Sequence, residues 1–328
     1  MSNERGVLLL ADFDDGPNAH AAQRRRALER LGLRVATFDL SAKPSLLERL
    51  RAGDLPRRLE RAIQEAAPDL ILAFGSPLLD EPLVDRLRAQ SRARWVTWLP
   101  DDLRTAHTAA ALARPYDQIY AIGTDVAADI ADRLGRTVDV LAVGADPSVY
   151  RPIRTKDQYR ANVVFAGAAT PRRERLLSEV AEFGLAIWGP GWRQTSLRDY
   201  CRGEAASTEE YVNAYGGATV AINIHHVLVE GDPHEAACNQ RLFELAAMGA
   251  AQVVDERGDL PRYFRGGDEV LPFHDAAELR EHVRELVENP AEAERLGQAA
   301  RARLLRDHTY MHRLRHLLLD QPRPMLPA

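Results

Sequence analysis

The feature that most constrains the fold is an alternation of short apolar runs with longer amphipathic segments along the first half of the chain. The apolar runs are rich in Val, Ile and Leu, and they are candidate strands at 7–13, 33–40, 70–74, 94–99, 118–122 and 137–143. Segments with helical spacing of their apolar residues lie between them at 20–32, 81–90 and 125–135. Strands that alternate with helices predict a parallel sheet covered on both faces, a doubly wound α/β domain.

The alternation starts again after the charged segment 154–160. Candidate strands then follow at 162–166, 185–188, 219–224, 251–254 and 269–273. Three capping patterns predict helix starts: Thr170-Pro171, Ser207 with Glu210, and Asp275 with Glu278. The amphipathic stretch 290–319 predicts one or two terminal helices.

The length of 328 residues exceeds what one hydrophobic core usually supports. We therefore expect two doubly wound, Rossmann-like domains, at 1–153 and 154–305. Residues 306–328 are expected to form a helix and tail that cross back to the first domain. Open parallel sheets bind ligands beyond the carboxyl ends of their strands, so the loops after the strands are the candidate site.

Composition excludes some classes of function. Lys and Arg number 43 against 48 Asp and Glu, a formal charge of −5, so no overall positive field favours a nucleic-acid partner. Two cysteines cannot form a disulfide framework, and the first apolar stretch is too short for a signal peptide. No run approaches the ~20 apolar residues that span a bilayer. We expect a cytoplasmic protein without a transmembrane segment; the oligomeric state stays open.

The most informative segment is 239–260, in which a loop opens a helix that ends at Gly249 and leads into an apolar strand. A helix N-terminus carries unpaired N–H groups and positive partial charge, which favour a pyrophosphate. Glu244 lies about one turn in, where its carboxylate can accept hydrogen bonds from ribose hydroxyls. Arg241 in the first turn opposes the helix dipole, and an arginine in such an unfavourable position often indicates a ligand. An ordinary amphipathic helix with solvated charges is the alternative.

This segment resembles the C-terminal domain of GT-B glycosyltransferases, and specifically of the spore-maturation CgeB-like group. The shared pattern is Asn-x-Arg-x-Phe-Glu-x-x-Ala-x-Gly, formed here by Asn239, Arg241, Phe243, Glu244, Ala247 and Gly249. Further matches follow at Asp255, Phe264-x-x-Gly267, Phe273 and His308-Thr309-Tyr310-x-x-Arg313. The resemblance covers roughly 160–320 and is weaker before that, where it rests on strand order, 98–102 and the Gly144–Asp146 turn.

The resemblance implies a GT-B fold and a nucleoside-diphosphate sugar, such as a UDP-sugar, as donor. It implies a hexosyltransferase-like enzyme, metal-independent and retaining, with no cofactor. Donor-binding candidates are the motif residues Asn239, Arg241, Phe243 and Glu244 together with Gly167, Arg172, Arg173, Gly189, Ala237 and Cys238. In retaining GT-B enzymes another glutamate, near the sugar, stands eight positions before the glutamate that binds the ribose; that position is Ala236 here, with Glu235 beside it. Either the loop brings Glu235 in, or the amides of 237–239 replace it.

Two metal motifs are weak. Asp12-Phe-Asp14 lies on the first strand, too early for the metal-binding DxD of sugar transferases, and 234–238 lacks the last histidine of a zinc motif. No metal site is therefore expected. Asp15 and Gly16 fit the loop after the first strand, on the acceptor side.

Catalytic candidates lie at two strand ends: Asp101, beside Asp102, and His225, beside His226. A helix cap and a surface loop are their respective alternatives. Two other functions remain open for the chain as a whole, a GT-B sugar-nucleotide epimerase and a non-catalytic nucleotide-sugar-binding protein. Our sequence-based interpretation is a glycosyltransferase with an unknown acceptor.

Overall fold

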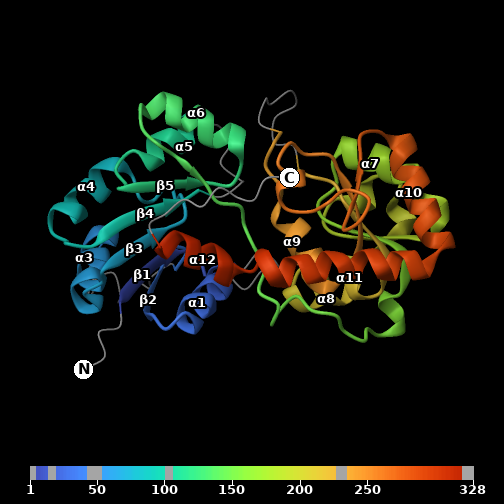
Figure 1. The fold of residues 1–328 in the computed structure, drawn as a ribbon, viewed down its shortest axis with the longest axis horizontal. Helices are drawn as coiled ribbons and strands as arrows, with labels where there is room; N and C mark the ends of the chain where they lie inside the picture. The colour runs from blue at the N-terminus through green and yellow to red at the C-terminus, as the bar shows by residue number, and fades with distance from the viewer. Residues whose placement is uncertain (1–4, 14–19, 43–53, 100–105, 227–234, 320–328) are drawn as a thin grey trace.

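The computed structural model describes residues 5–13, 20–42, 54–99, 106–226 and 235–319. The chain forms two parallel sheets of six strands each, one in each half (Figure 1). Both orders and directions agree with the doubly wound α/β fold expected from the alternation of apolar and amphipathic segments.

The first sheet has the strand order β2-β1-β3-β4-β5-β6. Its strands are β1 (Gly6–Ala11), β2 (Arg34–Asp39), β3 (Leu70–Ala73), β4 (Arg94–Trp98), β5 (Gln118–Ala121) and β6 (Asp139–Val140). The helices between them are α1 (His20–Arg30), α3 (Leu55–Ala66), α4 (Glu81–Ala89), α5 (Ala106–Ala113) and α6 (Thr124–Leu134). The run 137–143 was predicted as a full strand, but only two of its residues pair, at the edge of the sheet.

The second sheet has the order β12-β11-β10-β7-β8-β9. Its strands are β7 (Ala161–Ala166), β8 (Leu185–Trp188), β9 (Cys201–Gly203), β10 (Ala218–Asn223), β11 (Ala251–Asp255) and β12 (Leu271–Phe273). The helices are α7 (Pro171–Ser178), α8 (Thr208–Gly216), α9 (Gln240–Met248), α10 (Ala276–Glu288), α11 (Pro290–Asp307) and α12 (Tyr310–Leu318). The capping residues Thr170, Ser207 and Asp275 each accept the expected backbone hydrogen bond.

The stretch 290–319 forms two helices, separated at His308 and Thr309. Thr309 starts α12 with a capping box in which His312 takes part. Helix α12 packs against α1 in the first half of the chain (Figure 1). Arg313 on α12 donates a hydrogen bond to the carbonyl of Val143 at 3.0 Å, so this helix is tied to the segment that leaves the first sheet.

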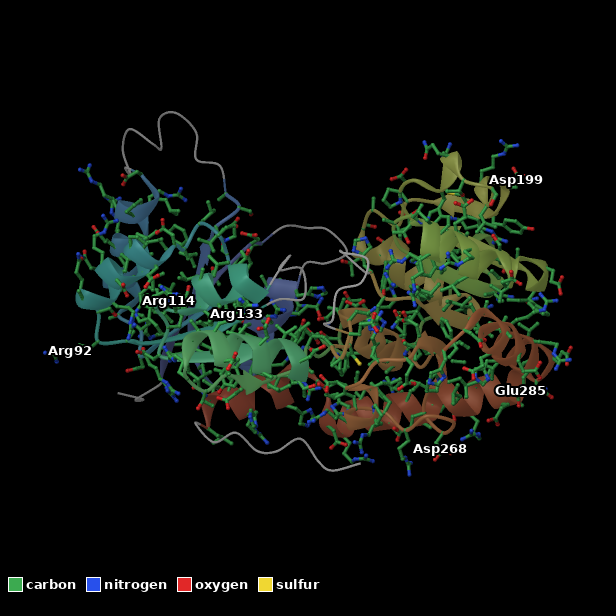
Figure 2. All side chains as sticks on the ribbon, turned by 90° about the horizontal axis from the view of Figure 1, so that it is seen from above. Arg92, Arg114, Arg133, Asp199, Asp268 and Glu285 are labelled. Atoms are coloured by element: carbon green, nitrogen blue, oxygen red, sulfur yellow. The ribbon has the colours of Figure 1, made fainter. Side chains whose placement is uncertain are left out.

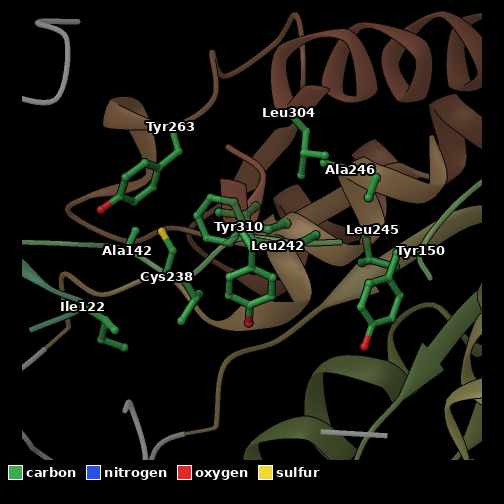
Figure 3. Close-up of a cluster of buried hydrophobic side chains, with 14 of the residues drawn as sticks. Ile122, Ala142, Tyr150, Cys238, Leu242, Leu245, Ala246, Tyr263, Leu304 and Tyr310 are labelled. Atoms are coloured by element: carbon green, nitrogen blue, oxygen red, sulfur yellow. The ribbon is translucent and has the colours of Figure 1, made fainter. Parts of the chain in front are cut away.

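One buried apolar cluster joins the two halves. It includes Ile122 and Ala142 from the first half, Cys238 and Leu242 from the second, and Tyr310 from α12 (Figure 3). Burial of apolar surface stabilises such contacts by about 25 cal/mol per Å². The relative position of the two sheets therefore depends on hydrophobic packing as well as on the chain crossings.

Charged side chains project from the outer surfaces of both halves (Figure 2), and examples are Arg92, Arg114, Arg133, Asp199, Asp268 and Glu285. Among the helices of the described residues, none has the length and apolar character that crossing a membrane requires.

Helix α9 begins and ends where the sequence predicts. The side chain of Asn239 accepts a hydrogen bond from the N–H of Leu242 at 3.1 Å, and Gly249 ends the helix in the left-handed conformation at φ 71°. Every residue from Leu242 to Met248 is buried, because α9 packs against both β11 and α11. The helix therefore has a fixed position from which its first turn can present side chains.

This packing generates a prediction about Gly297, which lies within α11. A Cβ at this position would lie 2.1 Å from the carbonyl oxygen of Gly249. Alanine is favoured over glycine in a helix by about 1 kcal/mol, but here the added methyl group forces α11 away from α9. We expect Gly297→Ala to lower the free energy of unfolding in urea by about 1–3 kcal/mol. Gln298→Ala, on the exposed side of the same helix, is the control and changes it by less than about 0.5 kcal/mol. Equal or greater stability of Gly297→Ala contradicts the close packing.

Candidate functional site

The candidate site lies at the carboxyl ends of β7 and β10, the neighbouring strands at which the second sheet reverses its order. Doubly wound sheets bind ligands at this reversal, because the loops after the two strands diverge to opposite faces. The loop after β7 leads through Gly167 to α7, and the loop after β10 contains His225 and His226. Both segments were singled out from the sequence.

Two arginines converge on the main chain at Gly167. A Cβ at this position would lie 3.1 Å from Nη2 of Arg241 and 3.4 Å from Nη1 of Arg173, so glycine leaves room for both. Arg173 is buried and donates hydrogen bonds to the carbonyls of Ala168 at 2.9 Å and Ile224 at 2.8 Å. These bonds hold its guanidinium group across the two loops.

Several hydrogen-bond donors of these arginines are unsatisfied. Burial and then the charge of Arg241 lower the pKa of Arg173 to about 9. Within the described part of the chain, Nε of Arg173 and both Nε and Nη1 of Arg241 are buried without a hydrogen-bond partner. Unsatisfied buried donors cost about 1–3 kcal/mol each, and more when charged. The arrangement therefore favours an anion that supplies the missing acceptors.

The turn after β8 supports this loop closely. Gly189 has φ 136°, and a Cβ there would lie 2.2 Å from the carbonyl oxygen of Gly167. That same oxygen accepts a hydrogen bond from Nε1 of Trp192 at 2.7 Å, and the N–H of Gly167 donates to the carbonyl of Trp188 at 2.8 Å. Gly189 is thus needed for the close approach of the turn after β8 to the loop after β7, and this contact fixes the loop at Gly167.

Asp255, at the end of β11, organises the other side of the site. Its carboxylate accepts from the backbone N–H of His225 at 3.0 Å and pairs with Arg172 at 2.9 Å and Arg257 at 3.2 Å. Burial opposes ionisation of Asp255, but the His225 contact and the two guanidinium groups outweigh it and hold its pKa well below the usual range. Arg172 is therefore an ion-pair partner of Asp255 at the edge of the site.

His225 has a partner at each ring nitrogen. Nε2 accepts the backbone N–H of Asn239 at 2.9 Å, so the proton of the neutral ring is on Nδ1, which lies 2.6 Å from Oδ1 of Asp255. Burial lowers the pKa of His225, although Asp255 acts in the opposite direction. This candidate catalytic residue therefore positions the start of α9. Because the amide of Asn239 donates to His225, it is not free to donate to a ligand.

Glu244 is buried and faces the first half of the chain. Its Oε2 accepts a hydrogen bond from the hydroxyl group of Tyr211 at 2.8 Å, and its Oε1 lies 3.9 Å from Nδ1 of His20. Burial, with a smaller effect of Arg24, lowers the pKa of His20 to about 3, so the imidazole is neutral. The solvated position that was the alternative for Glu244 is not observed.

Sequence analysis did not identify Tyr211 and His20. The only signals were that Tyr211 lies one turn beyond the Ser207 cap, and that His20 begins the first amphipathic helix. Neither signal distinguishes a site residue from an ordinary helical one.

Several predicted site residues lie elsewhere. Phe243 was expected to contact the donor, but it packs against Tyr263, Phe264 and His308, because two positions along a helix turn it away from Arg241. Cys238 is buried in the cluster of Figure 3.

The segment 235–237 is placed by contacts with the first half. The N–H of Ala236 donates to Asp125 at 2.8 Å, and a Cβ at Gly123 would lie 2.7 Å from that of Ala237. Glu235 is exposed. His226 is exposed; partial desolvation of its ring, followed by the charges of Arg173 and Arg241, lowers its pKa. The remaining candidates lie outside the described residues: Asp15, Gly16, Asp101, Asp102 and His234.

The carboxyl edges of the two sheets face each other at this site. Thr124, which follows β5, donates from its backbone N–H and its hydroxyl to the carboxylate of Asp259, each at 2.8 Å. Gln240, the first residue of α9, donates to the carbonyl of Gly144. Ligands of the two halves can therefore approach each other between these edges.

Comparison with known proteins identifies the second half. Residues 172–319 match a protein family described as Glycosyl transferase-like. None of the curated proteins is similar enough in sequence to give a match.

Solved structures share the fold over the full length of the chain. A sucrose-phosphate synthase from Thermosynechococcus elongatus is 14% identical with a TM-score of 0.67, over 96% of this chain and 98% of that one. HepE from Anabaena, in complex with UDP-glucose, is 14% identical with a TM-score of 0.63, over 96% and 99%. A glycosyltransferase from Rickettsia africae is 10% identical with a TM-score of 0.65, over 97% of both chains. The chain thus has the GT-B fold, and its residues 172–319 match a glycosyltransferase-like family domain.

The neutral state of His225 generates a prediction about pH. A histidine whose pKa is lowered by folding takes up its proton more readily in the unfolded chain, so its contribution to stability is lost as the pH falls below the unfolded value of about 6.5. His20, with its pKa lowered to about 3, acts in the same direction. We expect the free energy of unfolding to fall between pH 6.5 and 5, with each such residue contributing at most about 1.4 kcal/mol per pH unit.

Urea unfolding at several pH values measures this slope. The slope should be smaller in the His225→Asn variant. The exposed His274, whose pKa is raised by its hydrogen bond to Glu278, contributes to the pH dependence of stability with the opposite sign. A slope that is the same in His225→Asn and in the unsubstituted protein shows that His225 does not stay neutral in the folded state.

Proposed function

We propose that this chain transfers a sugar from a nucleoside-diphosphate sugar to an acceptor bound by the first half. The observation that carries the proposal is the pair Arg173 and Arg241, two guanidinium groups with buried, unsatisfied donors beside Gly167. A diphosphate matches them in charge and in hydrogen-bonding geometry, because guanidinium groups bind phosphate oxygens through parallel N–H donors.

The distribution of charge around the site supports an anionic ligand. Four arginines surround the loops, but the carboxylate of Asp255 pairs with only two of them, Arg172 and Arg257. Arg173 and Arg241 point to the loop of Gly167 instead. A bound diphosphate replaces the repulsion between these two cations with charge-assisted hydrogen bonds of about 1.5–3 kcal/mol each.

Glu244 is proposed to hold the ribose. It lies one turn beyond Arg241 on α9, and its hydrogen bond from Tyr211 orients the carboxylate. A buried carboxylate that accepts hydroxyl protons suits a diol. The resemblance to the CgeB-like group, in which we propose to place this chain, gives the same role to this glutamate.

The proposed reaction is independent of metal ions and retains the anomeric configuration. Fixed guanidinium groups stabilise the charge that develops on the leaving diphosphate, which is the part a metal ion plays elsewhere. His225 has both ring nitrogens engaged, so it is poorly suited to act as the general base of an inverting reaction. UDP-glucose is the first donor to test, since it is bound in the HepE structure. Both cysteines are free thiols, which suits the proposed cytoplasmic location.

Nuclear magnetic resonance of the protein with UDP-glucose, in the presence of a chelator, tests the proposal. Release of UDP together with an α-linked product, or slow hydrolysis when no acceptor is present, supports it. An epimerised sugar nucleotide identifies an epimerase, and binding without any reaction identifies a binding protein.

Replacement of Arg241 distinguishes a ligand-binding role from a structural one. Arg241→Met keeps the length of the side chain and removes a buried charge. We expect affinity for UDP-glucose, measured by calorimetric titration, to fall ~10–100-fold, since ~1.4 kcal/mol is tenfold. The melting temperature should stay constant or rise, as is common when a strained functional residue is replaced. Arg175→Met, on the exposed face of α7, is the control. Lower stability with normal affinity makes Arg241 a structural residue.

Glu244→Gln tests the ribose contact. Glutamine keeps the shape of the side chain and an acceptor for Tyr211. Loss of the charge should weaken UDP-glucose binding ~10–100-fold, because each charge-assisted hydrogen bond is worth ~1.5–3 kcal/mol. The exposed Glu209, replaced in the same way, leaves the affinity unchanged. Normal affinity of Glu244→Gln restricts this glutamate to a contact between the two halves.

A further inference from the structure

Arg24 on α1 is a cation enclosed by aromatic rings. Its guanidinium carbon lies 4.1 Å from the ring centre of Phe74, 5.2 Å from that of Trp98 and 5.4 Å from that of Tyr310. A guanidinium group at these distances is attracted by the negative face of each ring. The three rings therefore hold the group in one place without neutralising its charge.

No carboxylate of the described residues forms an ion pair with Arg24. Its Nε is buried without a hydrogen-bond partner among the described residues. Its other polar contact is with the hydroxyl group of Tyr310. Arg25, the next residue along the helix, differs: it is exposed and forms an ion pair with Glu29 at 3.4 Å. Within the described residues, Arg24 thus lacks both an ion-pair partner and an acceptor for Nε, in contrast to its neighbour Arg25.

The aromatic rings place Arg24 at the edge that faces the donor half. Phe74 directly follows β3 and Trp98 ends β4, so both lie at the carboxyl edge of the first sheet. The hydroxyl of Tyr310 donates to Oε1 of Gln240 at 3.0 Å, and Gln240 precedes Arg241 on α9. Arg24 therefore belongs to the acceptor half and lies beside the helix that is proposed to carry the donor.

We infer that Arg24 binds an anionic group of the acceptor, a phosphate or a carboxylate. This inference rests on the proposed function and adds the chemical class of the acceptor. A phosphate or carboxylate supplies the acceptor that Nε lacks and the negative charge that the aromatic rings cannot provide. Arg24 is then a specificity residue, which selects acidic or phosphorylated acceptors over neutral ones.

Calorimetric titration of the protein saturated with UDP tests this inference with three probes of the same ring: glucose 6-phosphate, glucuronate and glucose. We expect at least one of the two anions to bind at least ~10-fold more tightly than glucose, and comparison of the two distinguishes phosphate from carboxylate. Arg24→Met fills the same space between the rings and should lose that preference. Arg24→Lys keeps the charge without the planar group and should retain part of it. Arg25→Met should behave like the unsubstituted protein.

Affinity for UDP itself separates this inference from the proposed function. Arg24→Met should bind UDP within about twofold of the unsubstituted protein, whereas Arg241→Met should not. The inference is overturned if the affinity for glucose equals that for both anions, or if none of the three probes binds. It is also overturned if Arg24→Met keeps the preference for an anion, or if this variant loses affinity for UDP instead. Failure of the unsubstituted protein to bind UDP contradicts the proposed function.

Discussion

The buried carboxylate of Asp255 is the contact on which the geometry of the site depends. It lies at the end of β11 and binds the backbone and ring of His225, and that ring in turn accepts the N–H of Asn239, the cap of α9. The ends of two strands and the start of one helix are thereby joined through one ionised group. Arg172 and Arg257 keep the carboxylate charged in a buried position, where an unpaired charge would be costly. Arg172 and Arg257 are engaged in ion pairs with Asp255. Of the four arginines around these loops, Arg173 and Arg241 are therefore the ones that can bind a ligand.

The two halves are held by contacts of different kinds around this centre. An apolar cluster and the return of α12 set their approximate relation. Polar contacts, such as that of Thr124 with Asp259, align the two carboxyl edges. Because α12 brings Tyr310 against both Arg24 and Gln240, the last helix of the chain takes part in organising both sides. The same helix that completes the first half thus also borders the start of α9.

Buried hydrogen-bond donors without acceptors reduce stability, and the presence of such donors on arginines at facing edges of the two halves indicates a function. Arg241 and Arg24 lie on α9 and α1, in different halves of the chain, and each has a buried donor that lacks an acceptor. Aromatic rings contact both guanidinium groups, Phe74 and Trp98 at Arg24 and Phe165 at Arg241, but they supply no acceptor for these donors. Two negatively charged ligands, one at Arg241 in the second half and one at Arg24 in the first, would supply the missing acceptors. The exposed surface carries charges of both signs, so this concentration of arginines with unsatisfied donors is local.

The sequence by itself determined what depends on neighbouring residues. Apolar runs and capping residues such as Thr170 and Asn239 act within a few positions, so the strands, the helix starts and the doubly wound class could be predicted. The edge strand β9 could not, because three residues carry too little pattern. Tertiary structure alone decided that His225 meets Asp255, 30 positions away, and that Phe243 enters the core. It also placed His20 beside Glu244, from opposite halves of the chain. These roles depend on burial and on contacts between segments far apart in the sequence, and the residues next to each position do not reveal such contacts.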